Sequence, residues 1–347
     1  MSLVARWRYY RRILPAYLGS GRSQLTFWHE TPEVNPRASL DAQAHDREPD
    51  DRRVDDPRPS ARRLPPYYMS FREKADYAGA YDVAGIPMLD YRGAIGLQYN
   101  PIAIAQWGLA NFNLFSETSD AARLQKTLKS ADWLTANLEQ NPHGCWVWNH
   151  HFDWEYRDTL RAPWYSGLAQ GQGVSLLLRA HAQTGDVEYE QAAERAFVAL
   201  TRPISQGGVL FEDDEQNLWI EEYLVNPPTH ILNGFMWALW GVFDFWRARA
   251  DSAAKQIFDR GVATLLHNLP RFDTGYWSLY EQSGTRLKML ASPFYHRLHI
   301  VQLRVMANLS GDGRFADFAD RWEGYARRRT NRTRAIAEKS MFKLLHY

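Results

Sequence analysis

Eight segments after residue 100 place apolar side chains at helical spacing, and this train of helices limits the fold more than any other feature of the sequence. The connections between the segments are alternately short and long, which is typical of helical hairpins stacked side by side. We therefore predict a mainly α fold, an incomplete α/α toroid. The predicted helices begin at residue 101 and then cover residues 121–138, 165–183, 187–203, 230–249, 252–269, 293–310 and 313–327.

The three long connections hold many Trp, Tyr, His and Gly residues; they are residues 139–164, 204–229 and 270–292. Short runs in them alternate apolar and polar side chains, as at residues 208–211 and 219–223, and predict short β-hairpins on the rim. In a ring of antiparallel helix pairs all such connections emerge at one end. We expect the functional site at that end.

The sequence before the helices divides into two parts. We interpret residues 1–66 as a basic arm followed by a polar linker. The linker, residues 36–66, has too few large apolar side chains for their burial to offset the entropy lost when a chain becomes ordered. Residues 67–100 contain aromatic stretches broken by glycines, the pattern of hairpins, and predict a small β element. The toroid then covers residues 101–330, and residues 331–347 form a C-terminal tail.

The first 18 residues carry four arginines among aromatic side chains but lack the apolar core of a signal peptide. We interpret this arm as a solvated or partner-docking segment, with peripheral membrane contact as the alternative. No apolar run approaches the roughly 20 residues that span a bilayer. A single cysteine, Cys145, excludes an internal disulfide. These features favour a cytoplasmic protein, and the sequence leaves a homodimer open.

Charge and motifs argue against several functional classes. The 41 basic and 40 acidic residues nearly cancel, so we predict no nucleic-acid partner. No Gly-x-Ser-x-Gly elbow, phosphate-binding glycine loop or dinucleotide fingerprint occurs. The histidines within residues 149–153 and 296–299 lack zinc-protease spacing, and we predict no metal. Aromatic residues reach 14%, which is typical either of an aromatic core or of a protein that stacks on sugar rings.

The adjacent Glu221 and Glu222 are candidates for acid–base chemistry, since two carboxyl groups form the machinery of most glycoside hydrolases. On a strand the two side chains would point to opposite faces, so only one could face a rim site. A hydrolase would then need a distant second carboxylate, for which Asp273 and Glu281 are the candidates. The sequence leaves this alternative open.

Tyrosine beside an acidic or basic residue recurs near the rim, at Tyr223, Tyr280 and Tyr295. Tyrosine, with a pKa of about 10, is a weak base, but a neighbouring cation lowers that pKa. Such a residue suits removal of a proton from the carbon next to a carboxylate, as in a uronate sugar. The side chains able to neutralise the developing charge are Arg286, His296, Arg297 and His299.

Five blocks of sequence, in order, resemble the C-terminal domain of the D-glucuronyl C5-epimerases, enzymes that convert D-glucuronate to L-iduronate within heparan-type polysaccharide. The resemblance covers residues 85–325, about two thirds of the chain. Five blocks in order indicate a common fold far more strongly than a single block would. The blocks are residues 99–109 (YNPIAIAQWGL), 163–173 (PWYSGLAQGQG), 221–223 with 231–236 (EEY and ILNGFM), 269–275 (LPRFDTG) and 295–303 (YHRLHIVQL).

The resemblance implies an isomerase, without metal or organic cofactor, that acts on glucuronate residues of a polysaccharide such as heparosan or of a shorter uronate-containing oligosaccharide. Inversion at C5 requires one group on each face of the sugar. The resemblance assigns Tyr223 and Tyr295 to these faces. It makes Glu222 a proton partner and Tyr280 an aid to positioning or acidity. The residues expected to line the groove and bind the sugar are Tyr99, Gln106, Trp164, Tyr165, Gln170, Gln172, Asn233, Arg286, His296, Arg297 and His299.

The chain departs from the family in two respects. The animal enzymes carry a sizeable β-rich region before the helices, whereas this chain has only the arm, the polar linker and the small β element. In the loop between Tyr280 and Tyr295, Arg286 is only a loose counterpart of the family's arginine. Three alternatives to the epimerase follow. A uronate polysaccharide lyase removes the same C5 proton and then eliminates the O4 substituent. A glycoside hydrolase on the same fold and a non-catalytic glycan-binding protein are the other two.

Overall fold

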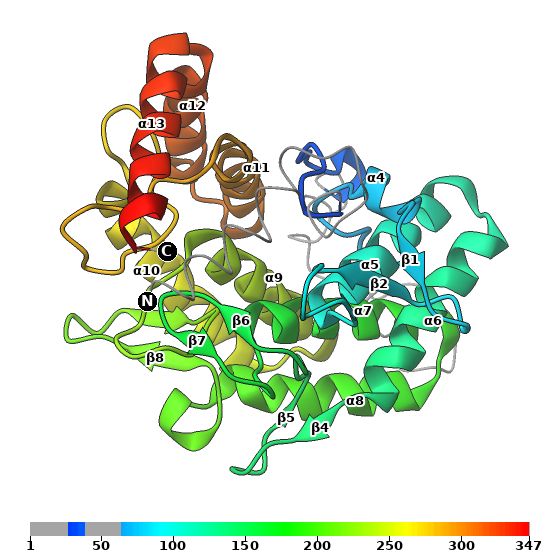
Figure 1. Cartoon of the computed structure of the whole chain (residues 1–347). Coiled ribbons are helices and arrows are strands. Elements are labelled where there is room, and N and C mark those ends of the chain that lie inside the picture. Colours follow the sequence, from blue (N-terminus) through cyan, green and yellow to red (C-terminus); the bar gives the residue numbers. More distant parts are fainter. Residues whose placement is uncertain (1–26, 39–63, 347) are drawn as a thin grey trace.

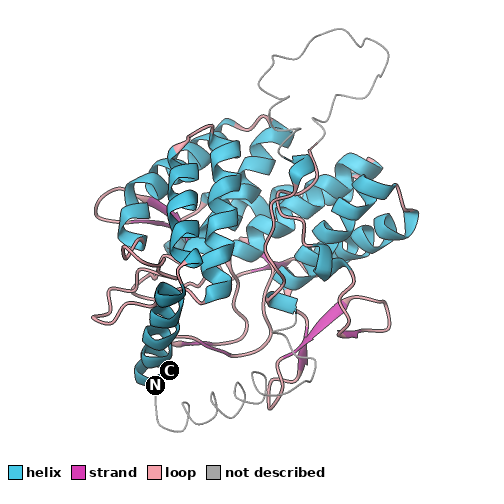
Figure 2. Ribbon diagram, turned by 90° about the horizontal axis from the view of Figure 1, so that it is seen from above, coloured by secondary structure: helices cyan, strands magenta, loops and turns pink. Residues whose placement is uncertain are grey.

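The computed structural model describes residues 27–38 and 64–346. Four helical hairpins form the body of the described chain (Figures 1 and 2). The helices follow the predicted segments closely, and the mainly α fold is confirmed. The hairpins are α5 (Pro101–Thr118) with α6 (Ala121–Ala136), α7 (Gly167–Thr184) with α8 (Val187–Phe197), α9 (Leu232–Arg249) with α10 (Ser252–Phe272), and α11 (Pro293–Ser310) with α12 (Arg314–Arg327).

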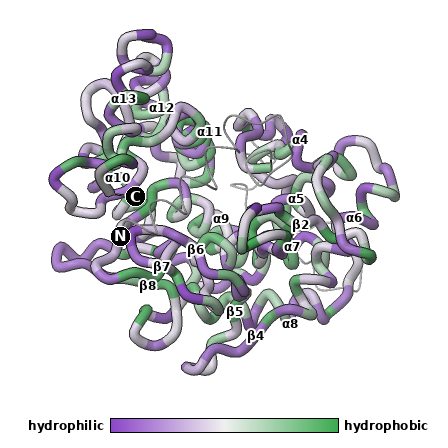
Figure 3. The backbone as a smooth tube through the Cα atoms, viewed as in Figure 1, coloured by the Kyte–Doolittle hydropathy of each residue, from purple (hydrophilic) through white to green (hydrophobic). Residues whose placement is uncertain are grey.

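The first helix of each hairpin forms an inner layer, in which α5 packs on α7, α7 on α9, and α9 on α11. Residues 101–114 of α5 and 167–180 of α7 are buried all round, as expected for helices enclosed by neighbours. The outer α6, in contrast, buries a single stripe. Figure 3 shows the corresponding concentration of hydrophobic residues in the central helices. Within the described residues no comparable packing joins α11 to α5, so the toroid is incomplete, as predicted.

Glycines allow α7 and α9 to pack at backbone distance. A Cβ added to Gly241 of α9 would come within 2.3 Å of the carbonyl oxygen of Gly171 in α7. A Cβ at Gly171 would in turn lie 2.5 Å from the Cα of Ala238. A larger side chain at either glycine would separate the two helices, because tightly packed interiors have no room for extra atoms.

Short β structure occurs where the sequence predicts it, before the helices and in the long connections. The small element at residues 67–100 contains α4 (Arg72–Ala75) and a three-stranded antiparallel sheet of β1 (Ala80–Tyr81), β2 (Pro87–Asp90) and β3 (Leu97–Gln98). The antiparallel hairpins of the long connections are β4 (Glu139–Gln140) with β5 (Trp146–Val147), β6 (Trp154–Glu155) with β7 (Thr159–Leu160), and β8 (Leu210–Glu212) with β9 (Leu218–Ile220).

Two segments differ from their sequence-based descriptions. The segment expected to be a C-terminal tail is the long helix α13 (Arg329–His346), which packs against α11 and α12 (Figure 1). The predicted helix at 187–203 ends at Phe197, and two 3₁₀ turns, Val198–Thr201 and Ile204–Gln206, follow it.

The described part of the N-terminal arm, residues 27–38, packs on the folded unit. Val34 pairs with Met69 in a β-bridge, and the Lys74 ammonium donates a hydrogen bond to the carbonyl of Phe27. The basic first 18 residues, on which the predicted membrane contact depends, lie outside the described residues. Among the described helices, none has the length and apolar character that crossing a membrane requires.

Candidate active site

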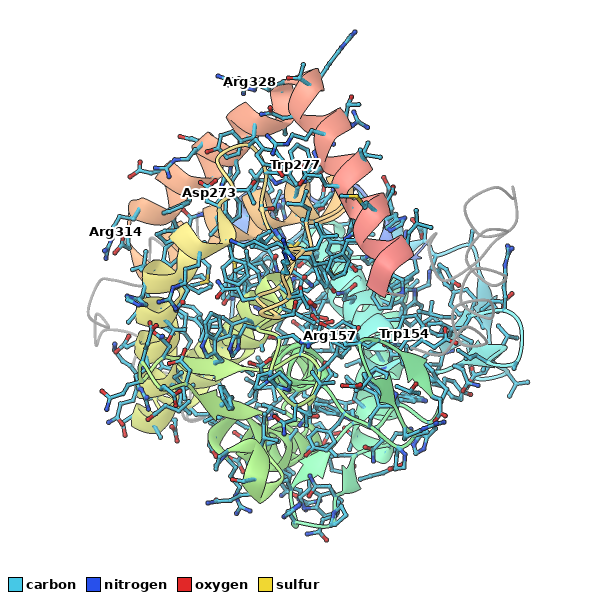
Figure 4. All side chains as sticks on the ribbon, turned by 60° about the vertical axis from the view of Figure 1, so that its left-hand side comes forward. Trp154, Arg157, Asp273, Trp277, Arg314 and Arg328 are labelled. Carbon is cyan, nitrogen blue, oxygen red and sulfur yellow. The ribbon has the colours of Figure 1, made fainter. Side chains whose placement is uncertain are left out.

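One cavity, of about 240 Å³, lies where the inner helices begin and the long connections meet. The helix ends contribute Asn100 before α5, Leu168 of α7, Asn233 of α9 and Ser292 before α11. Figure 4 shows Trp154, another lining residue, below the lower end of α13. The three long connections contribute His150, Phe152, Trp154, Glu155, Tyr156, Trp164, Glu222, Tyr223, Tyr280 and Met289.

Side-chain oxygens cap two of the helices that open on the cavity. The Asn100 side chain accepts hydrogen bonds from the backbone N–H groups of Ile102 and Ala103, and Ser292 accepts one from Tyr295. These caps fix where α5 and α11 begin. The positive ends of the inner-helix dipoles therefore face the cavity, which favours negative charge on a bound molecule.

The four residues predicted to be catalytic all line this cavity: Glu222, Tyr223, Tyr280 and Tyr295. The ring of Tyr295 meets that of Tyr280 edge to face, with centroids 4.8 Å apart. The ring of Tyr223 packs in the same manner on Tyr156, at 4.7 Å. Tyr223 and Tyr295 are partly exposed, whereas Tyr280 is buried. The fold thus brings together residues from separate connections, with the two exposed tyrosines open to one space.

Glu222 is a buried carboxyl group with an unusual proton affinity. Burial raises its pKa to about 8, and the charges of Glu221 and Glu281 add to this effect, while a hydrogen bond from Tyr223 opposes it. Its Oε2 atom has no hydrogen-bond partner among the described residues. At neutral pH Glu222 therefore carries its proton and is poised to exchange it with a neighbour.

The neighbouring Glu221 points away from the cavity, as expected for one member of an adjacent pair. Its carboxylate lies 2.5 Å from Nδ1 of His230 and accepts a hydrogen bond of 3.2 Å from the His230 backbone N–H. The His230 ring stacks on Trp219, with centroids 4.2 Å apart. Glu221 thus anchors the segment that leads into α9, and Glu222 alone of the pair faces the cavity.

Tyr280 is held in place by its backbone. Its N–H donates to the carbonyl of Met289 at 2.8 Å, and its own carbonyl accepts from the N–H of Leu232 in the first turn of α9 at 3.1 Å. Burial raises the pKa of the Tyr280 hydroxyl well above its ordinary value, and the nearby charge of Glu222 adds to the effect. The Tyr280 hydroxyl therefore keeps its proton at neutral pH.

Two of the residues predicted to bind sugar lie in the cavity wall, Trp164 and Asn233. The Trp164 ring is stacked on His150 with centroids 3.8 Å apart and packs edge-on against Tyr223 at 5.7 Å. The Oδ1 atom of Asn233 and the Nε1 atom of Trp237, one turn further along α9, are buried with no hydrogen-bond partner within the described part of the chain. Unsatisfied polar atoms of this kind suit a ligand rich in hydroxyl groups.

The predicted glutamines lie inside the ring of helices instead. Gln106 of α5 donates to Gln172 of α7 at 3.1 Å. Gln170 accepts from the backbone N–H of Trp148 at 3.0 Å and donates to the carbonyl of Ala196 at 3.0 Å. None of the three glutamines lines the cavity. Gln170 thus joins α7 to neighbouring segments, and the bond between Gln106 and Gln172 joins α5 to α7.

The two histidines predicted to neutralise charge are also interior. The Ser278 hydroxyl lies 2.8 Å from Nδ1 of His296 and 3.0 Å from Nδ1 of His299. The His296 ring stacks on Trp277, with centroids 3.8 Å apart. Burial lowers the pKa of His296 to about 4 and that of His299 well below its ordinary value. Both are neutral at neutral pH and lie outside the cavity wall, so they do not supply the predicted positive charge.

The remaining predicted sugar-binding residues also lie outside the cavity wall. The exposed Tyr99 donates its hydroxyl hydrogen to Asp82 at 2.7 Å, and Tyr165 donates to the carbonyl of Gly207 at 3.0 Å. The arginine side chains at 286 and 297 are exposed. The loop that carries Arg286 and the outward face of α11 that carries Arg297 therefore do not deliver a cation to the site.

The cavity wall contains residues that the sequence analysis did not predict. They come mostly from segments outside the five blocks, so no motif indicated them. A usable signal existed for Lys339 and Lys343, since lysines four residues apart occupy one face of a helix. These residues include Trp28, His29, Tyr91, Tyr156, Trp237, Lys339 and Lys343.

Solved structures with a similar arrangement include the unsaturated glucuronyl hydrolase of Bacillus sp. GL1, with a TM-score of 0.45 and 16% identity over 65% of this chain and 61% of that one. A family 76 glycoside hydrolase (mannosidase) of Bacteroides thetaiotaomicron gives a TM-score of 0.45 and 11% identity, over 67% of this chain and 60% of that one.

Sequence relatives are more informative. The chain is 33% identical over 214 residues to a D-glucuronyl C5-epimerase of Caenorhabditis elegans, which covers 57% of this chain and 34% of that protein. It is 27% identical over 198 residues to an uncharacterized protein of Methanocaldococcus jannaschii, over 56% of this chain and 63% of that protein. The matches thus span less than two thirds of either relative. Residues 140–324, more than half of the 347, match the family model of the D-glucuronyl C5-epimerase C-terminus, and the chain belongs to this family.

Proposed function

We propose that this protein is an isomerase that inverts C5 of D-glucuronate residues in a polysaccharide such as heparosan. It removes the C5 proton on one face of the sugar ring and returns a proton to the opposite face. The observation that carries the proposal is the opening of two partly exposed tyrosines, Tyr223 and Tyr295, onto one cavity beside the buried acid Glu222. Membership of the epimerase family supports the same reaction.

Tyr223 and Glu222 form the first half of the proposed mechanism. The reactive form is the one in which Glu222 has lost its proton: as the Tyr223 oxygen takes the C5 proton, its own phenolic proton passes to the Glu222 carboxylate, with which it is hydrogen-bonded. The raised pKa of Glu222 makes its carboxylate a far better proton acceptor than an ordinary glutamate. The pair therefore moves one proton without leaving an isolated phenolate in the cavity.

Tyr295 serves the other face. Its hydroxyl delivers a proton to C5 once the first proton has gone. The Tyr295 oxygen then takes a proton from solvent and Glu222 releases one to solvent, which restores the starting state. The reaction runs in both directions because each tyrosine can act as acid or base. Tyr280, in edge-to-face contact with Tyr295, keeps its own proton and donates a hydrogen bond at the site. The contact between the two rings holds Tyr295 in one orientation, which brings its hydroxyl to the sugar with little loss of entropy.

The intermediate is an enediolate that carries negative charge on the former carboxylate. The inner-helix N-termini around the cavity provide a field that lowers the energy of this charge. The unsatisfied polar atoms of Asn233 and Trp237 offer hydrogen bonds to sugar hydroxyls. These features stabilise the charged intermediate more than the substrate, which is what acceleration of the proton transfer requires.

The test is incubation of heparosan with the protein in D₂O, followed by NMR. We expect deuterium at C5 of the uronate and the appearance of iduronate signals. Unsaturated uronate ends would show a lyase instead, and shortened chains without unsaturation would show a hydrolase. Binding of heparosan without exchange or cleavage would show a glycan-binding protein. Each of these three outcomes overturns the proposal, and a Tyr223→Phe, Tyr295→Phe double variant provides the background rate.

A further inference from the structure

Two lysines of the C-terminal helix, Lys339 and Lys343, line the cavity together with the tyrosines. They lie four residues apart, about one helical turn, and therefore on the same face of α13. Helix α13 begins at Arg329, beyond the stretch at 140–324 that matches the epimerase family. These lysines are thus a contribution of this chain that the family match does not describe.

Lys339 is fixed beside the proposed catalytic residues. Its ammonium group donates a hydrogen bond to the carbonyl of Leu290 at 2.7 Å and lies 5.4 Å from the centroid of the Tyr280 ring. An ammonium group has three N–H donors, so this bond orients the group while leaving donors for a ligand. The contact with Leu290 also ties α13 to the loop that carries Tyr280.

The two ammonium groups lie in surroundings that disfavour their charge. Burial lowers the pKa of Lys339 to about 7, and repulsion from Lys343 contributes while Glu281 opposes it; burial also lowers the pKa of Lys343. Two cations held close together on a partly buried face repel one another, and a bound anion that pairs with both offsets that repulsion.

The cavity wall has few other sources of positive charge. Lys339 and Lys343 are the only lysines or arginines among the described residues that line it. The cations predicted from sequence lie elsewhere, because Arg286 and Arg297 are exposed outside the wall and the pKa values of His296 and His299 keep those rings neutral. A carboxylate that enters this cavity therefore meets the lysines of α13.

We propose that Lys339 and Lys343 bind the carboxylate of the reacting uronate, the role expected from the sequence for Arg286, His296, Arg297 and His299. The inference rests on the proposed function. The carboxyl carbon of a uronate is bonded directly to C5, so a carboxylate held beside Tyr280 keeps C5 among the tyrosines. Charge that moves onto the carboxylate oxygens as the proton leaves is then stabilised by both ammonium groups, which lowers the barrier to proton removal.

The test compares two ligands by titration calorimetry: a heparosan hexasaccharide, and the same oligosaccharide with its glucuronates reduced to glucose. We expect the wild type to prefer the acidic ligand. Lys339→Gln and Lys343→Gln should each weaken binding of the acidic ligand about tenfold, the effect of losing one charge-assisted hydrogen bond. Binding of the reduced ligand should not change. Arg286→Gln, the matched control, should leave both affinities unaltered.

The outcomes separate this inference from the proposed function. If the double Lys→Gln variant keeps the preference for the acidic ligand, or loses affinity for both ligands equally, the lysines do not bind the carboxylate and the inference is overturned. If the wild type exchanges C5 protons but the lysine variants exchange at the wild-type rate, the inference again fails while the epimerase stands. If the wild type binds neither ligand, both proposals fail. The double variant Lys339→Arg, Lys343→Arg keeps both charges and should retain the preference for the acidic ligand. It is the control that separates loss of charge from loss of folding.

Discussion

The carboxyl group of Glu222 lies against the backbone of Gly234 in the first turn of α9. A Cβ added at position 234 would come within 2.1 Å of Glu222 Oε2 and 2.7 Å of its Cβ. The acid can occupy its place beside the cavity only because residue 234 has no side chain.

The first prediction follows from this contact. Gly234→Ala should displace the Glu222 carboxyl and lower the rate of C5 proton exchange at least tenfold, since small shifts of a proton-transfer group are costly. The measurement is deuterium incorporation into heparosan. Gly324→Ala in α12 is the matched control, because a Cβ there meets nothing within 4 Å. Equal activity of the two variants would contradict the proposed role of Glu222.

Removal of single hydroxyl groups tests the two tyrosines. Tyr223→Phe and Tyr295→Phe should each reduce exchange by about 10²–10⁴, the usual contribution of a positioned acid or base. Both rings stay in their aromatic contacts, so the thermal midpoint should change little. Tyr99→Phe, whose hydroxyl lies outside the cavity on Asp82, should exchange at the wild-type rate. Full activity in either cavity variant would remove that tyrosine from the mechanism.

Glu222 should make the protein less stable as the pH rises. Its pKa is raised to about 8 from an ordinary 4.5, so between these values the folded state holds a proton that the unfolded state has lost. The free energy of unfolding then falls with pH, by up to about 1.4 kcal/mol per pH unit, and the fall ends above pH 8. Glu222→Gln cannot ionise, so it should gain stability over the wild type by a few kcal/mol between pH 5 and pH 8.

Urea unfolding at pH 5 and pH 8 measures this difference. The same substitution removes the proton acceptor of Tyr223, so the more stable variant should lack exchange activity. A stability difference between variant and wild type that is the same at both pH values would show that Glu222 is ionised throughout.

His296 should contribute to stability rather than to substrate binding. His296→Ala removes the stack on Trp277, takes away one of the two histidines that contact the Ser278 hydroxyl and leaves the carbonyl of Trp322 without its partner, so we expect a loss of about 2–4 kcal/mol in unfolding free energy. The exposed neighbour Arg297→Ala should change stability by less than about 0.5 kcal/mol. Denaturant unfolding checks both values. Normal stability with weakened heparosan binding in His296→Ala would restore the sequence-based assignment.

The fold was predictable because helical periodicity is a local property of the chain. Apolar spacing locates every helix of the four hairpins, and the long connections indicate the end at which the cavity lies. Helix ends are harder to locate from the sequence. Helix α8 ends at Phe197 and 3₁₀ turns follow, but no glycine or proline directly after Phe197 marks this end.

The site was predictable only in part. Glu222 and the three tyrosines follow from motifs, but a motif does not say which way a helix face points. Gln170 and His296 lie in the same blocks as cavity residues and face the interior. Lys339 lies far from every block, and its place beside Tyr280 depends on how α13 folds back over the hairpins. Tertiary packing decides such positions, and no local pattern in the sequence records it.

Residues that precede and residues that follow the family-matching stretch in the sequence both contribute to the cavity wall. Trp28 and His29 precede this stretch and Lys339 and Lys343 follow it, whereas the proton-transfer residues lie within it. Under the proposed function, part of the surface that meets the glycan is encoded on either side of the region that carries the proton-transfer residues. Exchange of the flanking segments between relatives is then a direct route to enzymes that accept new polymers while they retain the same inversion step.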